Sequence, residues 1–173
     1  DLTVTGVQTC ALPISEVGEL CLACSLYSLG MMGARWENIP TRIRHIFVRT
    51  AERGELKDQT ISNVVYGLSL LRASWAALDQ EFRDIIADNL GRDDAYGSDV
   101  PQHISNSIWG LAKMDAAWSE VPGTAVMNAF VRCHAQFAPQ EVSNSIYGLA
   151  VMDTAWDDLQ VTAQVALSAA LKR

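Results

Sequence analysis

Amide and aromatic side chains that could bind unpaired bases recur along one face of a predicted helix. Gln102, Asn106, Trp109 and Lys113 follow one another at i, i+4, i+7 and i+11, which places them on the same side of a helix. Side-chain amides can pair with base edges, and aromatic rings stack on bases for ~1–3 kcal/mol each. The spacing therefore predicts a surface that could hold single-stranded RNA.

Two other segments of the chain repeat this pattern. The matching candidates for RNA binding are Gln59, Asn63 and Tyr66 in the preceding segment, and Gln140, Asn144 and Tyr147 in the following one. A second interpretation remains open at every one of these positions. A recurring Asn can cap or bridge adjacent helices, and a recurring aromatic can fill the core between repeats.

The remaining reactive side chains do not form a recognisable catalytic or metal-binding pattern. Cys21 and Cys24 make a lone C-x-x-C without the second ligand pair that zinc needs, so we expect them to be small core residues of a helix. Cys133 and His134 are adjacent, and neighbours on a helix point apart. The sequence has no phosphate-binding loop, G-x-S-x-G or H-E-x-x-H motif, so it predicts no enzyme, no metal and no cofactor.

The elements that position these residues repeat at a regular interval. Four tryptophans lie 39, 43 and 38 residues apart, and each follows a Tyr or Trp by nine positions. This period is typical of two-helix solenoid repeats. The tryptophans are Trp36, Trp75, Trp118 and Trp156.

The fold that this period predicts is all-α, a right-handed α-solenoid of about four helix-turn-helix repeats. The expected repeats cover residues 17–57, 58–100, 101–138 and 139–173. The second helix of a unit is expected to run from Trp75 to Gly91, with the tryptophan as a packing anchor at the turn. Gly67, Gly110 and Gly148 fall inside the first helices, where Gly costs ~1 kcal/mol relative to Ala, so we expect a neighbouring helix to approach closely there.

Charge and hydropathy limit the classes of partner. The chain of 173 residues is 49% hydrophobic and has a formal net charge of −7, so it lacks the positive field of a nonspecific nucleic-acid binder. Charged residues break every apolar run short of the ~20 residues that a membrane span needs, and no membrane partner is expected. Basic residues cluster between Arg35 and Arg53, as either a basic edge or an ordinary solvated surface.

The first fifteen residues do not resemble the repeats. Residues 4–14, VTGVQTCALPI, match the conceptual translation of a common sequencing-library adapter. We therefore expect the authentic protein to begin near Glu16, with 1–15 a non-native or disordered leader and 16–173 a single solenoid domain. Codons that differ from the adapter across this run would refute that expectation.

The first helix of the last two units carries a recognisable motif. It reads Pro-Gln-x-x-Ser-Asn-x-x-Trp/Tyr-Gly-Leu-Ala-x-Met from Pro101 and from Pro139, and it resembles the first-helix signature of octotricopeptide-type repeats. Similar repeats occur in organellar RAP-domain proteins, FAST-kinase-like proteins and RNA-editing substrate-binding-complex proteins. The resemblance covers nearly all of residues 17–173 and is weakest in the first unit, where Cys24 replaces the Asn.

This resemblance implies a fragment of an RNA-binding protein of mitochondria or plastids. The implied role is in RNA processing, stability, editing or translation, together with protein partners of an RNA-processing complex. A protein–protein interaction scaffold is the alternative, because the acidic balance and the scarcity of Lys favour a protein ligand.

Overall fold

The computed structural model describes residues 18–56, 58–92, 94–97 and 100–172. Within these ranges every regular element is a helix. The α-helices are α1 (Glu19–Met31), α2 (Thr41–Arg53), α3 (Asp58–Leu70), α4 (Gln80–Gly91), α5 (Pro101–Lys113), α6 (Gly123–Cys133), α7 (Pro139–Val151) and α8 (Val161–Leu171). Short 3₁₀ turns cover Trp36–Asn38, Trp75–Ala77, Trp118–Glu120, His134–Gln136 and Trp156–Asp158. The predicted leader and the adapter-like run at 4–14 lie outside the described residues.

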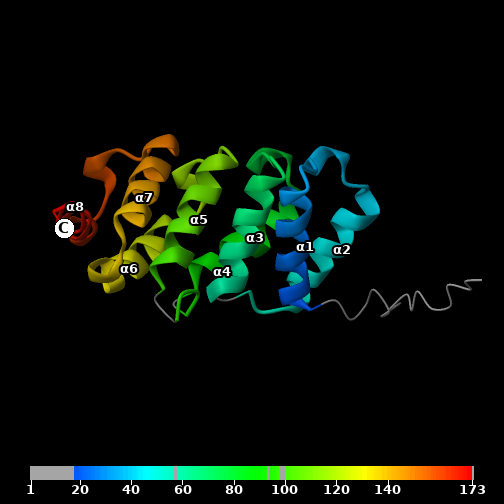
Figure 1. Cartoon of the computed structure of the whole chain (residues 1–173), viewed down its shortest axis with the longest axis horizontal. Helices are drawn as coiled ribbons and strands as arrows, with labels where there is room; N and C mark the ends of the chain where they lie inside the picture. The colour runs from blue at the N-terminus through cyan, green and yellow to red at the C-terminus, as the bar shows by residue number, and fades with distance from the viewer. Residues whose placement is uncertain (1–17, 57, 93, 98–99, 173) are drawn as a thin grey trace, which may run out of the picture.

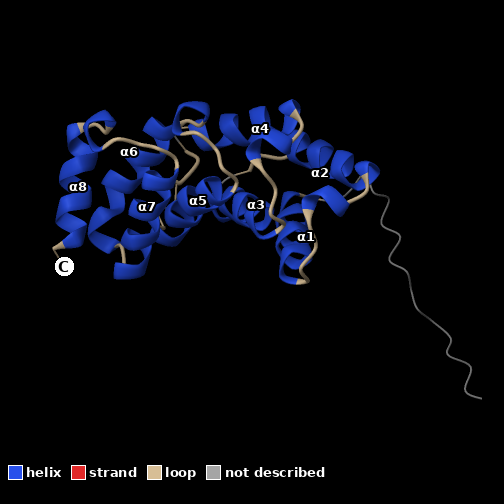
Figure 2. Cartoon of the chain, turned by 90° about the horizontal axis from the view of Figure 1, so that it is seen from above, coloured by secondary structure: helices blue, strands red, loops and turns tan. Residues whose placement is uncertain are grey.

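The helices form two layers, as expected for a solenoid of helical hairpins. The odd-numbered helices stand side by side in one row, and the even-numbered helices form a second row behind them (Figure 1). Seen from above, the two rows follow an arc with the odd-numbered helices on its inner side (Figure 2). The arc follows from packing, because neighbouring odd helices contact one another much more extensively than neighbouring even helices do. The predicted all-α solenoid is therefore confirmed.

Glycine allows the close approach of the odd helices. A Cβ added to Gly67 would lie 2.8 Å from the Tyr27 backbone nitrogen, and one added to Gly148 would lie 3.0 Å from the Ile108 carbonyl oxygen. At Gly110 the added Cβ would lie 2.8 Å from Cγ1 of Val65. These distances are shorter than ordinary side-chain contacts, so each glycine marks a point where two helix backbones nearly touch. The sequence-based expectation for the three glycines is correct.

Each odd helix ends in the same left-handed turn. Three positions before each tryptophan, φ is positive: 78° at Gly33, 54° at Arg72, 55° at Asp115 and 56° at Asp153. The next residue donates a backbone hydrogen bond back to the last helical turn, as from Ala73 to the Leu68 oxygen at 3.1 Å. This pairing is the Schellman motif, which satisfies the free carbonyls at a helix end and turns the chain away. It directs every tryptophan into its 3₁₀ turn.

The structure corrects the expected start of the second helix. Trp75 belongs to a separate 3₁₀ turn and α4 begins at Gln80, because the backbone at Leu78 and Asp79 is extended. The tryptophan anchors also differ among units. Trp36 and Trp75 are buried as predicted, Trp118 is half-buried, and Trp156 is 48% exposed. The anchoring role therefore does not hold at Trp156.

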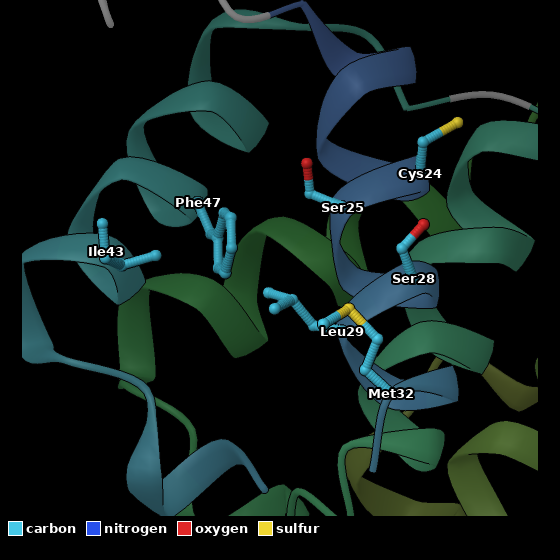
Figure 3. Close-up of a pocket in the computed structure, with 7 residues that line it drawn as sticks. All are labelled: Cys24, Ser25, Ser28, Leu29, Met32, Ile43 and Phe47. Atoms are coloured by element: carbon cyan, nitrogen blue, oxygen red, sulfur yellow. The ribbon is translucent and has the colours of Figure 1, made fainter. Parts of the chain in front are cut away.

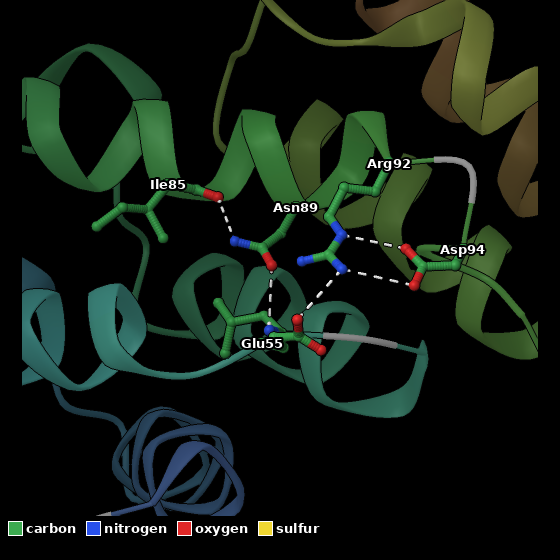
Figure 4. Close-up of polar contacts among 6 residues, drawn as sticks. Glu55, Ile85, Asn89, Arg92 and Asp94 are labelled. Atoms are coloured by element: carbon green, nitrogen blue, oxygen red, sulfur yellow. Dashed lines mark hydrogen bonds and ion pairs between the residues drawn. The ribbon is translucent and has the colours of Figure 1, made fainter.

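Polar contacts join the end of α4 to the connecting segments on either side of it (Figure 4). The buried Asn89 side chain accepts a hydrogen bond from the Leu56 backbone N–H at 3.1 Å and donates one to the Ile85 carbonyl at 2.8 Å. Arg92 forms an ion pair with Asp94 at 3.1 Å and with Glu55 at 3.4 Å. One buried amide thus joins α4 to the segment that leads into α3.

Candidate functional site

The ten residues predicted to bind RNA all lie on α3, α5 and α7, the inner row of the arc. None of their side chains is buried: Gln59, Gln102, Lys113, Gln140 and Tyr147 are exposed, and Asn63, Tyr66, Asn106, Trp109 and Asn144 are partly exposed. We call this surface, together with Tyr27 of α1, the inner face. The sequence pattern thus brought these residues onto one accessible side of the array.

Aromatic rings contact one another in sequence along the inner face. The ring centroids of Tyr27 and Tyr66 are 6.1 Å apart with their planes 24° from parallel, and those of Tyr66 and Trp109 are 5.5 Å apart at 40°. Lys113 continues the row, with its Nζ 5.3 Å from the Trp109 ring and 5.7 Å from the Tyr147 ring. The rings of the first three units therefore form a continuous row, and Lys113 links this row to the ring of the fourth unit. The rings pack between units, yet none is fully covered.

The recurring Asn side chains do not link or cap the helices that the structure describes. Within the described residues, the side chains of Asn63, Asn106 and Asn144 have no hydrogen-bond partner, and none of them caps a helix or bridges two. The side-chain oxygen and nitrogen atoms of these three residues are not fully buried, so they remain accessible to solvent. These three amides are therefore free to bind a ligand that offers both donors and acceptors.

The serine that precedes the Asn explains how the Asn reaches the inner face. Ser62 and Ser105 are buried between neighbouring helices, and each donates its hydroxyl to a carbonyl three residues earlier, at Gln59 and Gln102. A small, internally satisfied side chain lets the helices pack at that position. The following residue then projects to the side, onto the inner face.

A hollow of about 360 Å³ opens on the inner face where α1, α3 and α5 meet. It is lined by Ala23, Cys24, Tyr27, Asn63, Tyr66, Gln102 and Asn106. Four of these residues were predicted as candidates, and the other six predicted residues lie outside the hollow: Gln59, Trp109, Lys113, Gln140, Asn144 and Tyr147. Tyr27 and Cys24 were not among the predicted site residues, although Cys24 stands at the Asn position of the first unit. The nine-residue interval from Tyr27 to Trp36 was the signal that could have placed Tyr27 in the set.

The inner face carries little charge. The odd-numbered helices contain four charged residues: Glu19, Asp58, Lys113 and Glu141. Most of the negative charge of the chain therefore belongs to the even-numbered helices and the loops. The inner face neither repels a polyanion strongly nor neutralises many phosphates.

A second hollow, of about 490 Å³, lies between α1 and α2 (Figure 3). Leu29 of α1 and Met32, the residue directly after that helix, lie opposite Ile43 and Phe47 of α2. Cys24, Ser25 and Ser28 complete the wall. The described lining is mainly apolar and includes one thiol and two hydroxyls without a neighbouring base. A nucleophile needs such a base for activation, so the arrangement offers no catalytic pair.

The cysteines differ from expectation in one respect. Cys21 and Cys24 are both exposed, so the prediction that they are core residues is wrong. Cys24 lines both the hollow that α1 forms with α3 and α5 and the hollow between α1 and α2. Among the described residues, no cluster of three or more potential metal ligands is present. Cys133 is buried and bonds to the Ala129 carbonyl, whereas the ring of the adjacent His134 contacts the Val131 carbonyl.

The basic cluster of the first unit lies in the outer layer, away from the inner face. Arg49 of α2 pairs with Glu52 at 2.6 Å and approaches Glu81 at 3.9 Å, and these carboxylates raise its pKa. Arg44 lies over the Trp36 ring at 5.8 Å. Both side chains thus have protein partners, which favours the solvated-surface interpretation of this cluster over a basic edge.

No described helix is long and apolar enough to cross a membrane. Comparison with known proteins assigns no family: no protein-family model, no curated protein and no solved structure matches the chain.

Proposed function

We propose that the inner face binds single-stranded RNA and that the protein is a non-catalytic RNA-binding repeat protein. The observation that carries the proposal is the set of unpartnered amides beside the partly exposed rings. Asn63 and Asn106 offer donors and acceptors that no described protein group uses, and Tyr66 and Trp109 offer ring surface next to them. Unstacked bases supply both an edge to pair with an amide and a face to stack on a ring.

The cellular role in this proposal comes from the resemblance to octotricopeptide-type repeats. The proposed role is in the processing, stability, editing or translation of RNA in a mitochondrion or plastid. Protein partners of an RNA-processing complex belong to the same proposal.

The direct test removes the amides and leaves the rings in place. We expect Asn63→Ala with Asn106→Ala to lower the affinity for a fluorescently labelled single-stranded RNA pool about tenfold or more, since each lost amide–base pair costs ~1–3 kcal/mol. Thermal stability should stay close to that of the unaltered chain, because neither amide has a described protein partner. Fluorescence anisotropy measures the affinity.

Asn128→Ala is the matched control, because Asn128 is an exposed Asn of α6 in the outer layer. It should bind RNA like the unaltered chain. Equal affinity of the inner-face double variant and this control would exclude the inner face as the binding surface. A complete lack of binding by the unaltered chain would contradict the proposed function itself.

The low charge of the inner face also predicts an unusual salt dependence. A single strand loses affinity with a slope of ~0.7 in log K against log salt for each phosphate that is neutralised. Lys113 is the one cation among the odd helices. We therefore expect a slope that corresponds to about one neutralised phosphate. A steep slope would indicate that the arginines of α2 bind the RNA backbone instead.

The same lack of cations favours a second candidate function, a protein-interaction scaffold. A concave surface with few charges and with exposed aromatic rings also suits a peptide or a partner helix. Affinity capture with and without ribonuclease distinguishes the two functions. A partner that stays bound after nuclease treatment and is lost in the Asn63→Ala, Asn106→Ala variant would support the scaffold.

A further inference from the structure

The interfaces between odd helices follow one pattern, which predicts how the exposed end of the array is covered. Each odd helix presents a small, a branched and another small residue to the next one, at i, i+3 and i+7. On α5 these residues are Ser105, Ile108 and Ala112, all of them buried beneath α7. On α3 they are Ser62, Val65 and Ser69, buried beneath α5. In both cases the glycine of the following helix lies against the branched residue.

The last odd helix carries the same surface without a cover. On α7 the equivalent residues are Ser143, Ile146 and Ala150, identical in type to those that α5 buries. Ser143 and Ala150 are exposed and Ile146 is partly exposed. Figure 1 shows α7 and α8 at one end of the row, with no helix beyond them.

The tryptophan turn gives an independent sign of the same missing neighbour. The backbone N–H of Trp36 donates to the Leu71 carbonyl at 2.8 Å, and that of Trp75 to the Met114 carbonyl at 2.6 Å. Trp118 repeats the bond to Met152 at 3.4 Å. In each case the acceptor is the residue that closes the next odd helix. The N–H of Trp156 has no such acceptor within the described part of the chain.

A hollow marks the same end of the array. It measures about 440 Å³ and is lined by Trp156, Gln164, Val165, Ser168, Ala169 and Lys172. Trp156 and Val165 are 48% and 63% exposed, although both are large and apolar. Exposed apolar side chains that continue a buried interface are the expected signature of a docking surface.

We propose that this end face is a docking surface for one further helix-turn-helix unit of the same repeat, placed after α8 as α7 is placed after α6. The end face consists of Ser143, Ile146, Ala150, Trp156 and Val165. The incoming helix places a glycine against Ile146, and the residue that closes it offers its carbonyl to the Trp156 N–H. Three internal interfaces of this chain share that geometry.

The glycine requirement distinguishes this occupant from a second copy of the chain. At the start of the array, α1 has Ser28 at the position of Gly67, Gly110 and Gly148. A Cβ at Gly148 would already lie 2.8 Å from Ile108 Cγ2, and Ser28 adds an oxygen beyond that carbon. The α1 face of another molecule therefore fits poorly against Ile146, so head-to-tail assembly is disfavoured.

The test extends the chain by one unit in register. A second copy of residues 136–173 after Arg173 preserves the 38-residue interval between Trp118 and Trp156. We expect hydrogen exchange at the Trp156 backbone amide to be at least ~10-fold slower in the extended chain. The amide gains a hydrogen-bond acceptor there, and the added unit covers it. The helix content per molecule, measured by circular dichroism, should rise by the amount that one repeat unit contributes.

The matched control is the same extension with the glycine of the added first helix changed to Leu. In this control, the hydrogen-exchange rate of the Trp156 backbone amide should equal that in the chain of 173 residues. Unchanged exchange in the glycine-containing extension would overturn the proposal, whether the added unit is helical or not, because a unit that docks must fold against α7. Equal protection with glycine and with Leu would overturn it too. So would concentration-dependent self-association of the unextended chain that protects Trp156, since the occupant would then be a second copy.

Discussion

Gly67→Ala tests whether the contact between α1 and α3 depends on the absence of a side chain. A Cβ at residue 67 would lie 2.8 Å from the Tyr27 nitrogen, 2.9 Å from Leu26 Cβ and 3.0 Å from the Leu26 carbonyl carbon. Two of these atoms belong to the backbone of α1, so no rotamer change can relieve the contact. The two helices must move apart by several tenths of an ångström.

Two opposing effects set the size of the change. Alanine in place of a mid-helix glycine favours the helix by ~1 kcal/mol, whereas overpacking a close interface costs ~1–3 kcal/mol. Because the obstacle is backbone, we expect the upper part of that cost and a net loss of about 1–2 kcal/mol of unfolding free energy. This corresponds to a fall of ~2–8 °C in Tm for a chain of this length.

Urea denaturation followed by circular dichroism measures this loss. The matched control is Gly91→Ala at the end of α4, where the added Cβ would meet the Pro122 side chain at 3.3 Å. There we expect a change within ~0.5 kcal/mol. If Gly67→Ala were as stable as the unaltered chain, or more stable, the close-approach explanation of the repeated glycine would be refuted.

Three further substitutions probe the turn, the outer contacts and a buried phenol. Arg72 is exposed and has a φ of 54°, a left-handed conformation that is strained for a residue with a side chain. Arg72→Gly should therefore stabilise the fold by ~0.5–1 kcal/mol, measured by thermal denaturation. A loss of stability would contradict this strain. Asn89→Ala removes the acceptor of the buried Leu56 N–H and should cost ~1–3 kcal/mol in the same assay, whereas Asn128→Ala should cost little. Burial raises the pKa of the Tyr96 phenol above its ordinary value, so stability is complete below pH ~10 and falls as the pH rises, by up to ~1.4 kcal/mol per pH unit. Tyr96→Phe should lack this contribution when urea denaturation is compared at about pH 9 and pH 11, and an unchanged pH dependence would show that the phenol does not cause it.

The inner face could be predicted because a helix converts spacing into direction. Gln102, Asn106 and Trp109 fall on one side of any regular helix, and the same spacing in the next units aligns the surfaces once the units stack. The sequence could not reveal the ring contacts between Tyr66 and Trp109 or the lack of an amide partner at Asn106. These depend on the distance between helices of different units, which the glycines and serines of the interface set.

The sequence by itself determined that the chain repeats, that each unit is a pair of helices, and which glycines lie at close contacts. Each of these follows from periodicity and local backbone preference. The tertiary structure decided which equivalent residues are buried, since burial depends on having a neighbour. Trp75 and Trp156 occupy the same place in their units, yet one is 3% exposed and the other 48%. The difference arises because a following unit covers Trp75, whereas no unit within the described residues covers Trp156.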